Sequence, residues 1–402
     1  MSRIHVFTSA AGNYLPKVKV LFDSLAEHHP EWQRHLLLVE DWPDSELATL
    51  ALEAEIHQPR DLGIPYWRPW AFCHSMVELC TAVKPFMLKQ LLAREDCDAA
   101  VYLDPDICVF SALEEVTDSL AHHSMLLTPH LIAPEASLEG VIGNELTSLR
   151  FGTYNMGFIA VSASEVGQSF AQWWADRCYR FCRDDPEQGL FTDQRWLDLA
   201  PGLFPGVGIL RHPRLNVAAW NWNHRLLAYE NGGFKVSGEP MGFYHFTGFD
   251  SGDHQLMLEK YPAQRHIIEQ LMNSYREALS EADRLFSSNR WSFAHFDDGT
   301  PVTDACRRRF RDNPGLQETY PDPWHCGEAL LTAAIASRDG VGVGLGYVGA
   351  EPAVDGNKLI QLAMSAAKSP KLAADMARAA GRIMKTEGWH GVRRRLSKER
   401  ES

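Results

Sequence analysis

Residues 101–110 read VYLDPDICVF, an apolar run interrupted by the carboxylates of Asp104 and Asp106. The preceding AAVYL is typical of a buried strand, and an unpaired carboxylate inside a protein is very costly. The two acids must therefore meet a positive charge or emerge at the rim of a sheet. Side chains two residues apart on a strand point the same way, and Pro105 fixes the bend between them. The pattern predicts a carboxylate pair at a strand end, where Mn²⁺ or Mg²⁺ would neutralise it and hold a diphosphate. The alternative is a loop with solvated acids, because D-x-D is a common sequence.

Strands and helices alternate along the first 250 residues, which predicts an α/β fold with a mostly parallel sheet flanked by helices. The expected strands are 3–9, 34–41, 99–103, 124–128, 154–161, 207–210 and 241–246. The expected helices are 15–28, 43–54 with Asp44 or Ser45 as N-cap, 75–93 with a break at Pro85, and 164–182.

Helical patterns dominate after about residue 252. They cover 254–287, 325–338 and 358–390, with the turn-rich stretch HFDDGTPVTDACRRRFRDNPGLQ between the first two. We expect a catalytic domain over 1–251, a helical, turn-rich region over 252–338, a glycine-rich connector over 339–357, and a C-terminal helix with a basic tail over 358–402. The sequence GLGYVG at 344–349 matches G-x-G-x-x-G but lacks the flanking strand and helix of a dinucleotide site.

The formal net charge of the 402 residues is −13, which argues against a nucleic-acid-binding protein. Eight scattered cysteines predict ordinary buried thiols, and we find no signal peptide or membrane-spanning run, so a cytoplasmic protein is expected. From Met376 to the end, eight Lys and Arg residues face three Glu residues. This basic tail, which contains Trp389, is either a solvated helix end or a peripheral contact with the inner face of the cytoplasmic membrane.

Several other residues are candidates for a binding site at the carboxyl edge of the sheet. His245 is either a third metal ligand or a hydrogen-bonded rim histidine, and Gly248 would let a backbone amide approach a phosphate. Lys84 would neutralise a diphosphate or a carboxylate, or is simply an exposed helical lysine. Asn155 needs a partner inside its strand, either a sugar hydroxyl or a backbone group.

The turn after the first strand and a loop rich in Trp and Asn supply the remaining candidates. Thr8, Ser9, Ala10 and Tyr14 are expected just after the first strand, where a nucleotide would lie; the alternative is a polar turn, with Tyr14 in the core. In residues 211–225, RHPRLNVAAWNWNHR, the mixture of aromatic and amide side chains suits sugar rings. The sugar candidates there are Asn216, Trp220 and Asn221, and the alternative is an irregular core loop.

Five short elements, in this order, resemble those of GT-A glycosyltransferases, especially family 8 and its bacterial relatives. They are VFTSAAGNYLPKVKVLFDSL with AVKPFMLKQLL, then YLDPDICVF as D-x-D, YNMGFIAV as N-x-G, FTDQRWLDL as D-Q, and FYHFTGFD as H-x-x-G. The resemblance implies a GT-A fold, a metal held by Asp104, Asp106 and His245, and a donor nucleotide near the first strand. It also implies that Asp193 or Gln194 stabilises the transition state. Taken alone, Asp193 could instead stabilise a helix N-terminus capped by Thr192.

One departure concerns the lysine and Pro-Trp that family 8 members usually carry after H-x-x-G. This chain has Phe249-Asp250-Ser251 there, so Arg211, Arg214 or Arg225 would have to replace the lysine.

The sequence therefore predicts a metal-dependent glycosyltransferase that uses a nucleotide diphosphate sugar, UDP-linked, with Mn²⁺ or Mg²⁺. It would glycosylate a glycan, lipid-linked or protein acceptor with retention of configuration, in bacterial glycan or glycoconjugate synthesis. The alternatives are a nucleotidyltransferase that makes nucleotide sugars and a non-catalytic carbohydrate-binding protein on the same fold.

Overall fold

The computed structural model describes residues 3–260, 264–286 and 291–336. Its central sheet has the strand order β10-β6-β7-β4-β1-β2-β3. The bounds of these strands are β1 (Ile4–Ala10), β2 (Gln33–Leu38), β3 (Glu55–His57), β4 (Ala99–Leu103), β6 (Met125–Pro129), β7 (Tyr154–Ser162) and β10 (Val207–Ile209). Only β7 runs antiparallel to its neighbours β4 and β6. The predicted mixed, mostly parallel sheet is confirmed.

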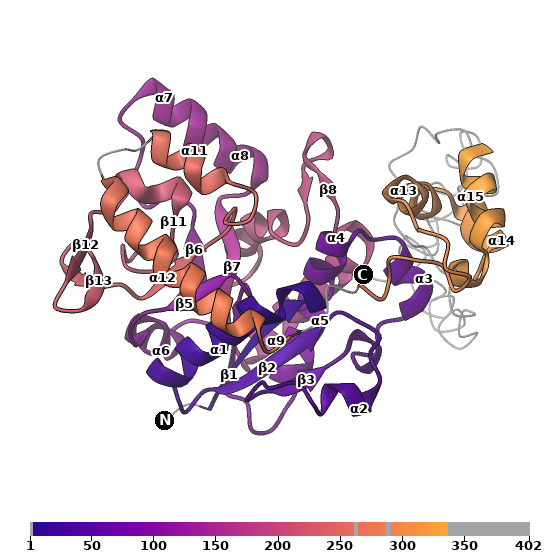
Figure 1. The fold of residues 1–402 in the computed structure, drawn as a ribbon, viewed down its shortest axis with the longest axis horizontal. Coiled ribbons are helices and arrows are strands. Elements are labelled where there is room, and N and C mark those ends of the chain that lie inside the picture. The colour runs from indigo at the N-terminus through magenta and orange to yellow at the C-terminus, as the bar shows by residue number, and fades with distance from the viewer. Residues whose placement is uncertain (1–2, 261–263, 287–290, 337–402) are drawn as a thin grey trace, which may run out of the picture. The chain divides into compact units, whose positions relative to one another are not determined.

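Helices cover both faces of this sheet (Figure 1). Their bounds are α1 (Leu15–His28), α2 (Asp44–Leu47), α3 (Trp67–Phe72), α4 (Met76–Ala82), α5 (Lys84–Leu92), α6 (Glu114–Leu120), α7 (Leu138–Gly140), α8 (Leu146–Phe151), α9 (Glu165–Phe181) and α10 (Ala200–Leu203). Buried residues that alternate along each strand enter two separate clusters. Phe7 and Tyr102 belong to one cluster, whereas Val6 and Val101 belong to the other. This period of two is the one expected of strands buried on both faces.

A smaller sheet extends the fold beyond the central one, with the order β11-β15-β5. It contains β5 (Ile107–Val109), β11 (Val217–Ala218) and β15 (Phe243–His245). Two further small sheets are built from β8 (Asp184–Asp185) with β9 (Leu190–Phe191), and from β12 (Leu227–Glu230), β13 (Gly233–Val236) and β14 (Glu239–Pro240). Because β5 follows β4 after only three residues, Asp104 and Asp106 lie in the short link between the two sheets.

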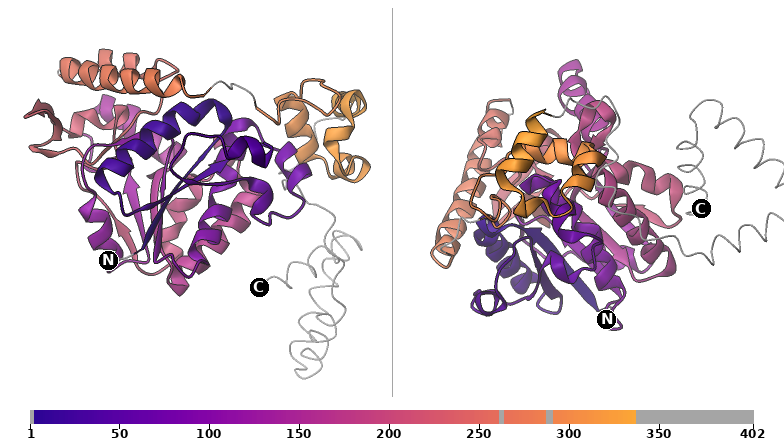
Figure 2. Two further views of the ribbon diagram at one scale, coloured as in Figure 1. Left: turned by 60° about the horizontal axis from the view of Figure 1, so that its bottom comes forward. Right: turned by 90° about the vertical axis from the view of Figure 1, so that its right-hand side faces the viewer.

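Helices follow the small sheet, as predicted. They are α11 (Asp253–Lys260), α12 (Arg265–Asp283), α13 (Asp304–Asp312), α14 (Pro314–Thr319) and α15 (Gly327–Ala336). The orange helix α12 packs along the indigo helix α1 (Figure 2). No helix in the part of the chain that the structure describes has both the length and the apolar character needed to cross a bilayer. The eight cysteines are free.

The structure corrects several predicted elements. The helix expected over 43–54 is only α2, with Pro43 rather than Asp44 or Ser45 at its N-cap. Leu47, Leu50 and Leu52 all pack against one core cluster, a spacing that a continued helix could not satisfy. The helix expected over 75–93 does break, at Val83, into α4 and α5.

The stretch expected to be turn-rich contains α13 and α14 instead. The side chains of Thr303 and Asn313 cap the N-termini of these two helices. The predicted helix over 358–390, the glycine-rich connector and the basic tail lie outside the described residues, and the predicted domain boundaries stay predictions.

Candidate active site

Asp104 and Asp106 lie between the end of β4 and the start of β5, at the carboxyl edge of the central sheet. Strand β15 runs antiparallel to β5 with His245 opposite Ile107, so strand pairing brings the imidazole against both carboxylates. Nε2 of His245 lies 3.1 Å from Oδ1 of Asp106 and 3.5 Å from Oδ2 of Asp104. The structure thus brings together the three residues that the sequence analysis grouped as metal ligands.

The orientation of the His245 ring is set by Asn155. Nδ1 of His245 lies 3.1 Å from Oδ1 of Asn155, which also accepts a hydrogen bond from the amide of Gly157. An amide oxygen only accepts, so Nδ1 carries the proton and Nε2 faces the acids. A Cβ on Gly157 would stand 2.4 Å from Cε1 of His245, so only glycine leaves room for the ring. Such outer partners are typical of metal-binding histidines.

Electrostatic coupling ties His245 to the acids. Burial disfavours charge on both Asp106 and His245, but their mutual attraction outweighs it. This attraction lowers the pKa of Asp106 and raises the pKa of His245. Asp106 is therefore kept ionised, and a proton on His245 would compete with a cation for the same place.

This donor set fits a small divalent cation. Two carboxylates and an imidazole are ligands that Mn²⁺ accepts, and carboxylates are the preferred ligands of Mg²⁺. Neighbouring ligands of an octahedral ion with bonds of about 2.1 Å lie about 3.0 Å apart. The 3.1 Å between Nε2 of His245 and Oδ1 of Asp106 is close to that value. The three side chains can therefore share one ion with little rearrangement.

Lys84 is a buried cation beside the pair. Its side chain is 4% exposed, and Nζ lies 3.2 Å from both Asp104 and Asp193. The alternative that Lys84 is an exposed helical lysine is therefore wrong. Lys84 neutralises the carboxylates of Asp104 and Asp193. Burial opposes its charge, but the two acids together raise its pKa well above the usual range. The hydroxyl of Tyr102 donates to the same oxygen of Asp104. Lys84 and Tyr102 thus hold Asp104 in place.

Asp193 and Gln194 lie beside this network but do not open an α-helix. Thr192 has φ of +45°, and its hydroxyl donates to Asp193, so the predicted N-cap at Thr192 is wrong. The next element is the 3₁₀ helix η5 (Arg195–Leu199). Burial raises the pKa of Asp193, while Lys84 opposes that shift. The Gln194 amide accepts from Met156 and donates to a backbone carbonyl.

The predicted nucleotide residues lie at the end of β1. This strand extends through Ala10, so Thr8, Ser9 and Ala10 end the strand rather than follow it as a turn. The Ser9 hydroxyl donates to the carbonyl of Cys80. The buried Thr8 hydroxyl has no hydrogen-bond partner among the described residues.

Lys17, on α1, is a site residue that the sequence analysis missed. Nζ of Lys17 lies 2.5 Å from Oδ2 of Asp250 and over the ring of Tyr14. Burial opposes its charge, but Asp250, Tyr14 and Asp106 outweigh burial and raise its pKa. Gly248, with φ of +73°, adopts the left-handed conformation shortly before Asp250. The signal in the sequence was Asp250, an acid in the segment where family 8 members carry lysine. An acid there needs a cationic partner from another part of the chain, and Lys17 is that partner.

Two of the three arginines considered as replacements for that lysine have other partners. Arg214 is buried in ion pairs with Glu114 and Glu115. Arg225 donates to two backbone carbonyls, and burial lowers its pKa to about 9. Arg211 is exposed. Arg214 and Arg225 therefore stabilise the loop that contains them.

The three residues predicted to contact a sugar have different surroundings. Asn221 is fully buried, accepts from the amide of Ala218 and donates to the carbonyl of Asn216, so it shapes the loop. The buried amide of Asn216 has no hydrogen-bond partner in the described chain. Trp220 is half-buried and packs edge-to-face on His245, with ring centroids 5.6 Å apart. Trp220 therefore packs against one of the candidate metal ligands.

Comparison with known proteins gives distant relatives. No family model matches the chain. The uncharacterized protein YfnF of Bacillus subtilis (strain 168) is 28% identical over 175 residues, 43% of this chain and 57% of YfnF, which is less than two thirds of its length. The uncharacterized protein YfnD of the same organism is 24% identical over 256 residues, 62% of this chain and 79% of YfnD.

Solved structures similar to this chain include glycosyltransferases, at low TM-scores. Galactosyltransferase LgtC, in complex with donor and acceptor sugar analogs, is 16% identical, with a TM-score of 0.39 over 69% of this chain and 95% of LgtC. Mouse xyloside xylosyltransferase 1 is 14% identical, with a TM-score of 0.35 over 61% of this chain and 97% of that enzyme. At these TM-scores the overlays carry no inference about activity, so the function depends on the residues of the site.

Proposed function

We propose that this chain is a metal-dependent glycosyltransferase that uses a nucleotide diphosphate sugar, with UDP as the nucleotide. The observation that carries the proposal is the convergence of Asp104, Asp106 and an oriented His245 at the carboxyl edge of the sheet. That edge is where open α/β sheets bind ligands. Mn²⁺ or Mg²⁺ held there would offset the charge of the leaving diphosphate.

The chain's own residues would divide the remaining tasks. Lys17 would add positive charge near the diphosphate, in place of the missing lysine. Lys84 and Asp193 would keep Asp104 oriented, and Asn155 would do the same for His245. The face of Trp220 would stack against a sugar. The contacts of Lys84 and Asn155 described above support this assignment.

In the transfer itself, the acceptor oxygen forms a bond to the anomeric carbon as the bond from that carbon to the diphosphate breaks. The hydroxyl proton leaves with the departing diphosphate or passes to water. Retention of configuration is the outcome that the sequence resemblance implies. A direct role for Asp193 or Gln194 at the reacting carbon stays a prediction, because both side chains are buried and already have partners. The bacterial glycan acceptor and a cytoplasmic location also stay predictions.

The test is incubation of the full chain with a panel of nucleotide sugars and Mn²⁺, measuring release of the nucleoside diphosphate. We expect slow release that EDTA abolishes and that Asp106→Asn and His245→Asn reduce at least about 100-fold. Asp118→Asn, at an exposed position on α6, is the matched control.

Other outcomes would select the alternatives. Release of pyrophosphate from a nucleoside triphosphate and a sugar 1-phosphate would identify a nucleotidyltransferase. Binding of free sugar in calorimetry, with no affinity for UDP in the presence of Mn²⁺, would identify a carbohydrate-binding protein.

A further inference from the structure

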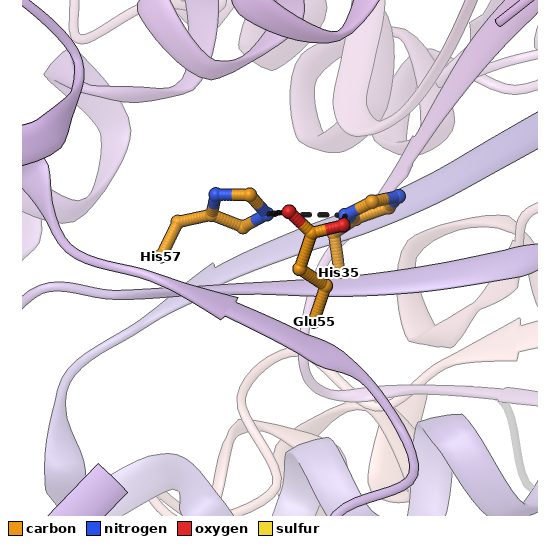
Figure 3. A group of neighbouring side chains, drawn as sticks. All are labelled: His35, Glu55 and His57. Carbon is orange, nitrogen blue, oxygen red and sulfur yellow. Dashed lines mark hydrogen bonds and ion pairs between the residues drawn. The ribbon is translucent and has the colours of Figure 1, made fainter. Parts of the chain in front are cut away.

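A second group of metal-binding side chains lies at the β3 edge of the central sheet, on strands β2 and β3. Parallel pairing places His35 opposite Glu55 and Leu37 opposite His57. Residues two apart on a strand share a face, so the side chains of His35, Glu55 and His57 all lie on one face of the sheet. The fold therefore gathers two imidazoles and a carboxylate at a single point (Figure 3).

The distances between these side chains match a tetrahedral metal site. Nδ1 of His35 lies 3.1 Å from Nε2 of His57. The two oxygens of Glu55 lie 3.5 Å from these nitrogens, one oxygen on each ring. In a tetrahedral Zn²⁺ site with bonds of about 2.0–2.1 Å, the ligand atoms lie about 3.3–3.4 Å apart. The two nitrogens are spaced almost as in such a site, and one ligand atom from each of the three residues lies within 4.8 Å of the others, so a small movement of the Glu55 side chain would complete the set.

Hydrogen bonds outside the group determine which nitrogen of His35 is free. Nε2 of His5 faces the carbonyl oxygen of Asp96 at 3.1 Å, and a carbonyl only accepts, so Nε2 of His5 carries the proton. Nδ1 of His5 is then an acceptor for Nε2–H of His35, at 2.8 Å. The neutral His35 ring is left with a bare Nδ1, pointing at Glu55 and His57. An outer partner that fixes the tautomer in this way is usual for metal-ligating histidines.

Charge and burial around the group also suit a cation. Arg94 pairs with both Glu55 and Asp96, so the two carboxylates exceed the single guanidinium by one negative charge. Arg94 would remain as an outer hydrogen-bond donor to a metal-bound Glu55. The imidazole rings of His35 and His57 are both buried. The Glu55 side chain is 48% exposed, which leaves an entry path.

We propose that His35, Glu55 and His57 bind one divalent transition-metal ion, with Zn²⁺ as the best match and water as the fourth ligand. Two imidazoles with a carboxylate suit Zn²⁺ better than Mg²⁺ or Ca²⁺. The ion would cross-link β3, a strand of three residues at the edge of the sheet, to β2. This metal stabilises the fold and does not depend on the proposed glycosyl transfer.

The test is Zn²⁺ titration of the full chain by calorimetry, together with thermal unfolding. The titration uses the His245→Asn background, which disables the candidate active site. We expect one Zn²⁺ per chain and a higher melting temperature. Glu55→Gln and His57→Asn should each weaken binding more than about 100-fold, and His5→Gln, which alters only the outer shell, about 10–100-fold. Glu53→Gln, whose side chain is 90% exposed, is the matched control.

Two results would overturn the proposal. One is a His245→Asn protein that folds normally, by circular dichroism, and takes up no Zn²⁺. The other is Zn²⁺ binding that keeps the same affinity in Glu55→Gln and His57→Asn. Because His57 and Glu55 lie on an edge strand, we expect both variants to fold. Glu55→Gln keeps the shape of the side chain, so it still tests the proposal if His57→Asn fails to fold.

Discussion

Gly157 is the residue on which the geometry of the candidate active site depends most. A Cβ there would stand 2.4 Å from Cε1 of His245 and 2.8 Å from Oδ1 of Asn155, distances that real contacts do not reach. We therefore expect Gly157→Ala to push the imidazole away from the carboxylates and to weaken Mn²⁺ binding about 10–100-fold. Calorimetry measures this change. Gly202→Ala, which meets nothing within 4 Å, should bind Mn²⁺ normally, and an unchanged affinity in Gly157→Ala would refute the geometry.

At the scale of elements, the position of helix α13 depends on Arg307. Its guanidinium is buried and donates to the carbonyls of Phe72, His74 and Phe293. Arg307→Met would leave these acceptors without their donor, so we expect a loss of about 3 kcal/mol in the free energy of unfolding. Exchange of backbone amide hydrogens in residues 291–336 should also be faster in this variant. Urea unfolding measures the loss, with the exposed Arg308→Met as control. Equal stability of the two variants would show that α13 does not need this anchor.

For the whole molecule, stability should fall as the pH drops below neutrality, and buried His74 contributes to this. Its Nδ1–H donates to the carbonyl of Trp70, and burial is the main cause that lowers its pKa to about 4. Glu78 opposes the shift, whereas Arg307 and Arg311 add to it. Below the usual histidine pKa of about 6.5, the imidazole of His74 binds a proton in the unfolded chain but stays neutral in the folded chain. Stability should therefore fall between about pH 6.5 and 4, with up to about 3 kcal/mol from this histidine.

Urea unfolding from pH 7.5 to 4.5 measures the contribution of His74. The slope of stability against pH should be shallower in His74→Asn than in the unchanged protein, whatever the stability of the variant at pH 7.5. The exposed His122→Asn should keep the original slope. Parallel curves for His74→Asn and the unchanged protein would show that His74 does not titrate as its burial implies.

The sequence analysis succeeded where neighbouring residues carry the signal. The apolar run before Asp104 identified a strand end, and the alternation of strands with helices identified a mostly parallel sheet flanked by helices. It failed where distant residues decide. Thr192 resembled an N-cap, but its backbone adopts φ of +45°. Lys84 was expected to neutralise a carboxylate, but its pairing with both Asp104 and Asp193 was not foreseen, because these acids are distant in sequence. Lys17 and the group around His35 were missed because their partners are distant in sequence.

The sequence by itself determined the order of strands and helices, the carboxylate pair at the end of β4, and His245 as their companion. The first two follow from local periodicity, which depends on residues a few positions apart, whereas the role of His245 came from the resemblance of FYHFTGFD to the H-x-x-G element. Only the tertiary structure decided that Gly157 leaves space for His245, that Asn155 sets its tautomer, and that the pairing of β2 with β3 places His35, Glu55 and His57 together. The physical reason is that strand register and burial join residues from distant parts of the chain, and no local pattern encodes those distances.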